Sequence, residues 1–213
     1  MRRISLLCFL CWQTLIAPAQ DAAFTDYRKK AENFSKISDK DIRSDLASFT
    51  IGGIVESLDK QPLQQVPPTK LDNRTLTYAN NHIVVTIVSS AFDTAHHKFT
   101  YEGRYLVKID GKPYYGNYTK IPQTRFASVT ALVDKDTIEI PQSALSDLYN
   151  PGFTFRDASG TLRSNDGVFL SADKRRIYIY MLNRDDTGSY EVTWIIQDKK
   201  YLRRVIDFGF SQQ

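Results

Sequence analysis

The sequence RIYIYMLNRDDTGSYEVTWIIQDKKYLRRVIDF, residues 176–208, decides the fold. β-Branched and aromatic residues predominate at positions 176–182 and 190–196, which predicts two strands. In the second of these, Tyr190, Val192, Trp194 and Ile196 recur at every other position and share one face. A turn at 183–189 joins the two strands, and a turn at 197–200 leads to a third strand over 201–208. The pattern therefore predicts a β-meander.

The middle of the chain has the same period of two. Residues 82–90 are apolar on both faces, which is typical of a strand at the centre of a sheet. Strands are also predicted at 125–133 and 137–140, and at 99–109 and 112–118 on either side of Asp110-Gly111, a strong hairpin signal. The predicted class is mainly β (α+β): an antiparallel β-sandwich or curled sheet with an N-terminal helix.

The N-terminal part of the chain differs in composition, because no glycine or proline occurs from Gln20 to Ser48. Apolar residues there recur at steps of three and four, as on one helical stripe: Phe24, Tyr27, Ala31, Phe34 and Ile37. Ser38 is a candidate N-cap for a second short helix that would bury Ile42 and Leu46.

These signals divide the chain into four parts. Residues 1–19 are a leader, and residues 20–58 are a helical segment followed by a first strand. Residues 59–72 are predicted to be a loop, because Pro62, Pro67 and Pro68 remove backbone donors. Residues 73–213 form the antiparallel β domain. A proline at 141 also predicts one or two helical turns over 141–149.

The leader has the pattern of a secretory signal peptide: Arg2-Arg3, an apolar run, then Ala17-Pro18-Ala19. We expect cleavage after Ala19 and a secreted or periplasmic mature protein. The apolar run is shorter than the ~20 residues that span a bilayer, so no stable membrane span is expected after cleavage. Both cysteines, Cys8 and Cys11, lie in the leader. The mature chain is therefore cysteine-free, which excludes disulfides and zinc-thiolate sites.

The charge balance bears on the partners. The chain has 28 Lys and Arg against 24 Asp and Glu, and loss of Arg2 and Arg3 lowers the net charge from +4 to +2. A nearly neutral chain lacks the basic excess that phosphate contacts require, so nucleic acid is not an expected partner. An unknown protein or a glycan remains as the partner class.

Motifs for catalysis and metal binding are weak. The sequence has no Gly-x-Ser-x-Gly and no phosphate-binding glycine loop. His96 and His97 are adjacent and would point to opposite faces, and His82 lies at the far end of its strand, so converging metal ligands are not expected. Residues 183–188 resemble a shortened calcium loop, but an ordinary turn is the preferred interpretation. We expect no cofactor, no metal and no catalytic residue.

Three glutamates keep one alternative open. Glu102, Glu139 and Glu191 each lie on a predicted strand. A glycosidase needs two carboxyl groups about 5–10 Å apart, one of them protonated. The alternation around all three favours the solvated outer face of a sheet instead.

The candidate ligand-binding residues are five tyrosines near the Asp110-Gly111 turn: Tyr101, Tyr105, Tyr114, Tyr115 and Tyr118. Tyrosines beside a hairpin are suited to stacking on a sugar or contacting a partner. The alternative is cross-strand aromatic pairing that stabilises the hairpin. If Tyr114 and Tyr118 are both buried, the binding platform does not form.

The leading hypothesis is an exported, β-rich, non-catalytic binding module for a glycan, a peptide or an envelope partner. The alternatives are a small exported hydrolase, possibly a carbohydrate-active one, and an accessory subunit of an envelope complex. An enzyme is expected to have a deep pocket with at least two converging ionisable groups. A binding module is expected to have a shallow apolar face.

Overall fold

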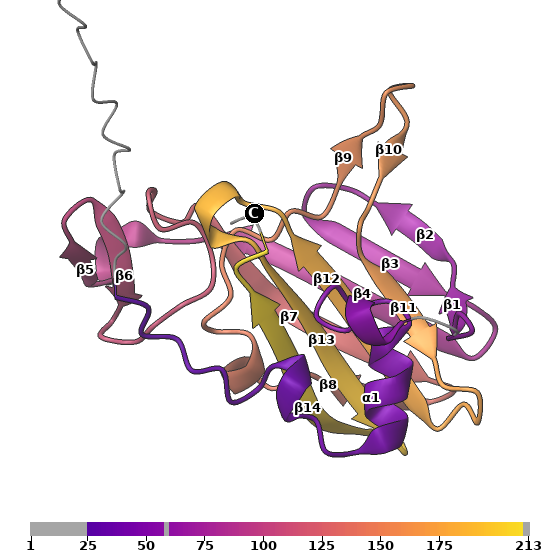
Figure 1. Cartoon of the computed structure of the whole chain (residues 1–213). Helices are drawn as coiled ribbons and strands as arrows, with labels where there is room; N and C mark the ends of the chain where they lie inside the picture. The colour runs from indigo at the N-terminus through magenta and orange to yellow at the C-terminus, as the bar shows by residue number, and fades with distance from the viewer. Residues whose placement is uncertain (1–24, 58–59, 211–213) are drawn as a thin grey trace, which may run out of the picture.

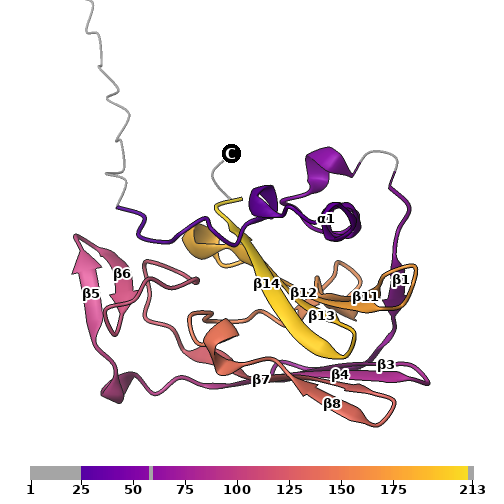
Figure 2. The same cartoon turned by 90° about the horizontal axis from the view of Figure 1, so that it is seen from below.

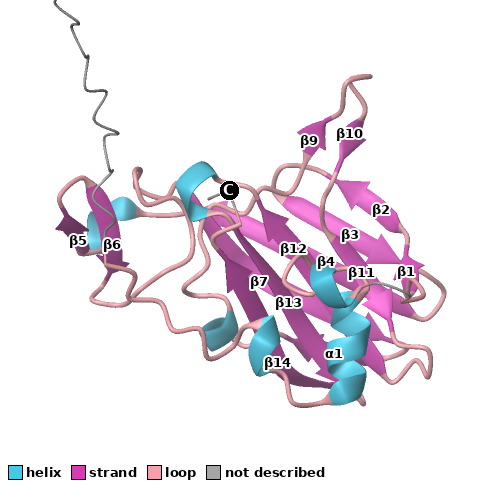
Figure 3. Cartoon of the chain, viewed as in Figure 1, coloured by secondary structure: helices cyan, strands magenta, loops and turns pink. Residues whose placement is uncertain are grey.

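A computed structural model describes residues 25–57 and 60–210. Within them the fold is mainly β with one α-helix, as the sequence predicts, and it contains two five-stranded antiparallel sheets (Figures 1 and 3). Sheet 1 has the strand order β1 (Gln64–Val66), β11 (Gly167–Leu170), β12 (Arg176–Asn183), β13 (Tyr190–Gln197) and β14 (Lys200–Phe208). Sheet 2 has the order β2 (Pro68–Leu71), β3 (Thr75–Ala79), β4 (Ile83–Ala91), β7 (Thr124–Val133) and β8 (Asp136–Glu139).

The two sheets lie face to face as separate layers, and α1 (Lys40–Ala47) covers the outer face of sheet 1 (Figure 2). The main core fills the space between the layers, where inward side chains of both sheets meet. Trp194 of β13 lies fully buried there, and its Nε1 donates a hydrogen bond to the Ala144 carbonyl at 3.0 Å. The buried indole ring is therefore packed in the core, and its N–H group has a hydrogen-bond acceptor.

The predicted meander is confirmed as β12, β13 and β14. Ile179 pairs with Trp194 across the first two strands, and Val192 pairs with Ile206 across the last two. Asp198 and Lys199 join β13 to β14 with φ of 49° and 61°. Two successive residues with positive φ are typical of the type I′ turn that matches the twist of a hairpin.

The segment predicted as a proline loop contains two strands, so that prediction is wrong. β1 ends at Val66 in sheet 1, and β2 begins at Pro68 in sheet 2. Both are edge strands of their sheets. A proline, which has no backbone donor, is tolerated at a sheet edge because it need not break a hydrogen bond to a neighbouring strand. The chain therefore passes from one layer to the other at Pro67.

The first predicted helix is also not observed. Residues 25–33 have no helical structure, and only a single 3-10 turn follows at Phe34–Lys36. The second helix is confirmed as α1, but Asp39 rather than Ser38 caps it, accepting from the amides of Asp41 and Ile42. No strand lies within residues 25–57, so the predicted first strand is absent from the described residues before 58.

Tertiary packing explains the false helical stripe. Phe34 and Ile37 are buried, as the stripe predicts. They pack against the outer face of sheet 1, however, from a segment that forms no α-helix. They share this second core with Ile42 and Leu46 of α1 and with three sheet residues: Tyr178, Ile195 and Val205.

The tyrosine-rich hairpin is shorter than predicted. β5 (Phe99–Glu102) and β6 (Tyr105–Ile109) pair around Gly103, whose φ is 58°. The chain does reverse at Asp110-Gly111, with hydrogen bonds between the backbones of Ile109 and Lys112. Residues 112–118, however, form no strand, because Pro113 lacks a backbone donor. Tyr114 and Tyr118 pack in a separate small core, whereas Tyr115 joins the main core.

Short elements complete the fold. β9 (Phe155–Arg156) and β10 (Leu162–Arg163) form a hairpin that projects from the body (Figure 1). Further 3-10 turns are Ile54–Glu56, Thr94–His96, Gln142–Ala144 and Asp186–Gly188. The turn at Gln142–Ala144 is the structured part of the helical turns predicted over 141–149.

The predicted leader, its cleavage site and both cysteines lie outside the described residues. Among the residues that the structure does describe, no helix is both long and apolar enough to cross a membrane.

Candidate functional site

Three of the five candidate tyrosines are buried. Tyr114, Tyr115 and Tyr118 expose 2%, 6% and 3% of their surface. The Tyr114 hydroxyl donates toward the carbonyls of Asn117 at 2.7 Å and Leu106 at 3.2 Å, and its ring packs edge-on against Tyr118. Burial raises the pKa of the Tyr115 phenol to about 12, because the charged form loses its solvation. An exposed platform that includes these three rings is therefore not formed.

The other two tyrosines lie on facing strands of the β5–β6 hairpin. Tyr101 is 49% exposed, and Tyr105 is half-buried with its hydroxyl 3.0 Å from Nη2 of Arg104. One exposed ring does not make a flat stacking surface. Across these strands Tyr101 pairs with Leu106 and Tyr105 with Glu102, so the two tyrosines do not face each other as a cross-strand pair either.

The N-terminal segment, residues 25–36, lies across these tyrosines. The Arg28 guanidinium lies 3.9 Å from the ring centre of Phe208 and 4.6 Å from that of Tyr118. The hydroxyl of Tyr27 donates to Glu102. These contacts lie on the face that the sequence assigns to a ligand. A cavity of about 370 Å³ lies between this segment, Tyr115 and Arg204.

A partly buried ion network fixes the same segment to sheet 1. Arg204 of β14 donates two hydrogen bonds to Asp147, at 2.6 and 2.8 Å, and one to Glu32 at 2.9 Å. Burial alone would lower the pKa of Arg204, but hydrogen bonds to Asp147 and the charges of Asp147 and Glu32 raise it overall. The network is a structural clamp, with its cation already occupied.

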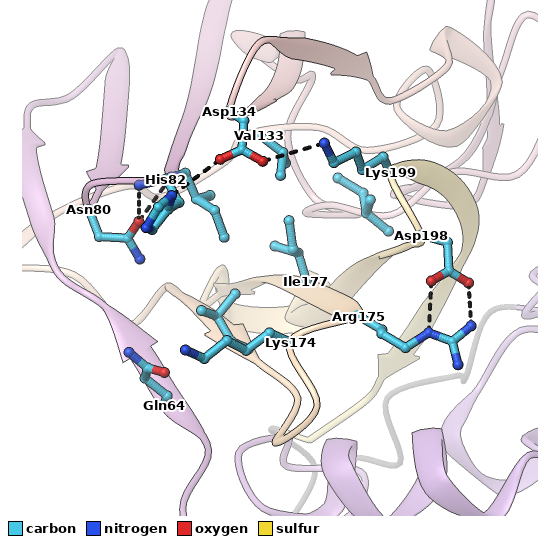
Figure 4. Close-up of a pocket in the computed structure, with 13 residues that line it drawn as sticks. Gln64, Asn80, His82, Val133, Asp134, Lys174, Arg175, Ile177, Asp198 and Lys199 are labelled. Atoms are coloured by element: carbon cyan, nitrogen blue, oxygen red, sulfur yellow. Dashed lines mark hydrogen bonds and ion pairs between the residues drawn. The ribbon is translucent and has the colours of Figure 1, made fainter.

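The strongest candidate site is a cavity of about 410 Å³ at the end of the sandwich where four turns meet. The turns are β3–β4 and β7–β8 of sheet 2 and β11–β12 and β13–β14 of sheet 1. Five aliphatic side chains line it: Ile83, Val133, Leu170, Ile177 and Ile196. The other lining residues are polar or charged: Gln64, Asn80, His82, Asp134, Lys174, Arg175, Asp198 and Lys199 (Figure 4). We call this the four-turn cavity.

Most charges at its rim are paired. Asp134 Oδ1 lies 3.2 Å from His82 Nδ1, and its Oδ2 lies 3.4 Å from Lys199 Nζ. Asp198 binds the Arg175 guanidinium through two contacts, at 2.7 and 2.8 Å. Hydrogen bonds to these partners lower the pKa of both carboxyl groups. The two acids of the cavity are therefore charged at neutral pH.

Lys174 is the exception at the rim. Within residues 25–57 and 60–210, no carboxylate pairs with its ammonium. Its neighbour Asp173 is directed elsewhere, because it accepts from the Ser171 hydroxyl and the Arg175 amide. A positive φ of 58° at Lys174 places this residue at the turning point between β11 and β12.

Three acids with raised pKa lie outside this cavity: Glu191, Asp207 and Asp166. Glu191 was expected on a solvated face, which is wrong, because the loop after α1 covers it. Its carboxylate accepts from the amides of Ile51 at 2.8 Å and Gly52 at 2.6 Å and from the Tyr180 hydroxyl at 2.8 Å. Burial raises its pKa in spite of these bonds. Glu102 and Glu139 are, as expected, not buried.

Asp166 has a strongly perturbed pKa that the sequence did not predict. Burial raises its pKa to about 7. Its Oδ1 accepts from the Leu182 amide at 2.9 Å, and its Oδ2 lies 2.8 Å from Ser164 Oγ, which is also 2.7 Å from the Phe153 carbonyl. The serine hydroxyl has only one proton, so both contacts are satisfied when protonated Asp166 donates to Ser164 and Ser164 donates to Phe153. Asp166 thus serves as a structural hydrogen-bonding group.

The three histidines are separate, and each lies beside an aspartate. His82 contacts Asp134, His96 contacts Asp93 at 2.6 Å and His97 contacts Asp110 at 2.6 Å. No group of three potential metal-ligating side chains occurs in the described part of the chain. The loop that resembles a calcium site contains the 3-10 turn at 186–188, and Asp185 Oδ1 accepts from the Asn117 amide group at 3.0 Å.

Comparison with known proteins adds no assignment, because the chain matches no protein-family model, no curated protein and no solved structure.

Proposed function

We propose that the protein is an exported, non-catalytic binding module whose ligand occupies the four-turn cavity. The observation that supports this is a cavity of about 410 Å³ that is lined by aliphatic residues of the core between the sheets and has a charged rim. Its size lies within the ~300–1,000 Å³ of small-molecule sites, and such sites combine an apolar lining with a few polar groups.

The lining favours one kind of ligand among those expected from the sequence. None of its residues is phenylalanine, tyrosine or tryptophan. Sugar rings are bound by stacking on such side chains, so the cavity fits a glycan poorly. Isoleucine, valine and leucine from both sheets instead fit an aliphatic group, carried by a peptide, an envelope partner or a small molecule.

The hydrolase alternative receives less support. Glycosidases need one carboxyl group that stays protonated and one that is charged. Asp134 and Asp198 both have a lowered pKa, so neither is suited to act as the acid. The acids with raised pKa, Asp166, Glu191 and Asp207, do not line the cavity, and each accepts hydrogen bonds from backbone amides.

The test is to fill the cavity from its mouth. Val133→Phe adds volume at a half-buried lining residue, whereas Leu132→Phe adds the same ring on the opposite, exposed side of β7. We expect a thermal-shift panel of aliphatic compounds, hydrophobic peptides and glycans to contain aliphatic ligands that stabilise the parent and Leu132→Phe but not Val133→Phe. A ligand at a hundredfold excess over its Kd stabilises by ~2.7 kcal/mol, which is readily detected. Equal shifts in all three proteins would contradict the proposal.

A further inference from the structure

We propose that the four-turn cavity selects an amphipathic anion: an aliphatic chain in the cavity and a carboxylate or similar head group at Lys174. This inference rests on the proposed function and specifies the chemical class of the ligand. It combines two features: the composition of the lining, and a rim cation, Lys174, that pairs with no carboxylate in the part of the chain that the structure describes.

The lining fits a flexible chain. Ile83 and Val133 come from adjacent strands of sheet 2, and Leu170, Ile177 and Ile196 come from three neighbouring strands of sheet 1. Aliphatic side chains therefore face each other from the two layers. A hydrocarbon chain inserted between them loses contact with water along its length, at about 25 cal/mol per Å² buried.

The rim determines the charge of the head group. Arg175 and Lys199 already bind carboxylates, and Lys199 also lies 2.8 Å from Asp136. Asp134 and Asp198 are likewise occupied, so a cationic head group finds no free carboxylate among the lining residues. An anionic head group, in contrast, finds the free ammonium of Lys174 without breaking any ion pair.

The position of Lys174 fits this role. It lies in the turn that joins Leu170 and Ile177, which both line the cavity, so the cation and the apolar lining belong to one hairpin (Figure 4). The Asp173 carboxylate points toward Ser171 and the Arg175 amide. The hairpin thus presents, beside an aliphatic lining, an ammonium that no carboxylate of the described residues pairs with.

The test uses three probes with the same tail: decanoate, decan-1-ol and decyltrimethylammonium. Isothermal titration calorimetry compares the parent with Lys174→Gln, Lys174→Glu and a control, Lys120→Glu. Lys120 is exposed and does not line the cavity. Far-UV circular dichroism confirms that each variant is folded.

We expect the parent and Lys120→Glu to bind decanoate more tightly than the alcohol or the cation. Lys174→Gln is expected to weaken decanoate binding by roughly tenfold, since a hydrogen bond to a charged group contributes about 1.5 kcal/mol or more. Lys174→Glu is expected to reverse the preference, so that decyltrimethylammonium binds more tightly than decanoate.

The outcomes separate this inference from the proposed function. Equal binding of all three probes, lost only on Val133→Phe, would keep the cavity as a binding site and overturn the role of Lys174. Binding that neither Val133→Phe nor Lys174→Glu affects would overturn both. Decanoate binding that Lys120→Glu weakens as much as Lys174→Glu would show that only overall charge matters, which also overturns the inference.

Discussion

Lys199 Nζ lies 3.4 Å from Oδ2 of Asp134 and 2.8 Å from Oδ2 of Asp136, so one lysine ties sheet 1 to sheet 2 at the mouth of the four-turn cavity. Lys199 belongs to the β13–β14 turn of sheet 1, and Asp134 to the β7–β8 turn of sheet 2. His82 contacts the same carboxylate from a third turn. The rim is therefore held together by side chains that are themselves exposed.

This geometry predicts a local rather than a global effect for Lys199→Gln. Both partners are exposed, and solvent screens exposed pairs, so we expect the unfolding temperature to stay within experimental error of the parent. Hydrogen exchange is expected to become faster at the amides of the two turns, because the sheets are no longer tied at this end. Lys200→Gln removes the adjacent exposed charge and is the matched control. A large drop in unfolding temperature would contradict this interpretation.

Arg204→Met is predicted to destabilise the whole protein. The change leaves Asp147 without the guanidinium that binds it through two hydrogen bonds. Removing one partner of a buried pair costs several kcal/mol, and partial exposure of Asp147 and Glu32 reduces the expected loss to about 2–3 kcal/mol. Urea denaturation measures the change. Arg203→Met, at the neighbouring half-exposed position, is expected to cost much less, and an equal loss would argue against the clamp.

Asp166 is predicted to make stability fall as the pH rises. Its pKa is about 7 when folded and about 3.9 in an unfolded chain, so the stabilisation is complete below about pH 4 and is lost as the pH rises through about 7. The change is on the order of 4 kcal/mol. Asp166→Asn retains the acceptor for Leu182 and donates to Ser164 without titrating. The free energy of unfolding, measured from pH 4 to 8, should therefore fall less steeply with rising pH for the variant than for the parent. Identical slopes would contradict the assignment.

Tyr114→Phe tests whether the tyrosine cluster is a structural core. The variant loses a hydroxyl that lies beside two buried carbonyls, and we expect a loss of about 1 kcal/mol in unfolding free energy. Tyr101→Phe removes an exposed hydroxyl from the same hairpin and should leave stability unchanged. Ligand binding should be unaffected in both variants. A tyrosine platform would be supported instead if either change weakened binding at constant stability.

The repeating parts of the fold could be predicted from local sequence. Alternation from Tyr190 to Ile196 and from Ile83 to Val88 reports burial directly, since a strand has a period of two. The turn predicted at 197–200 is confirmed as well, with Asp198 and Lys199 at positive φ. What failed was the N-terminal segment, where Phe34 and Ile37 have helical spacing but are buried by contacts with distant strands.

The candidate site was harder to predict because its parts are far apart in sequence. The five tyrosines were proposed as a binding site because they are close in sequence. Tyr114 and Tyr118 are close because they pack against each other in a buried core. The four-turn cavity has a weak signal that local reading passed over: an Asp-Lys pair recurs in three of its turns, at 134–135, 173–174 and 198–199. Only the pairing of strands brings these turns to one end of the sandwich.

The most direct test of the central claim is a titration of the protein with decanoate, followed by NMR of the backbone amides. If the four-turn cavity is the ligand site, saturable shift changes will cluster at Ile83, Val133, Leu170, Ile177 and Ile196 and their turns, and Val133→Phe will abolish them. Changes confined to the β5–β6 hairpin around Tyr101, or none at any accessible concentration, would contradict it.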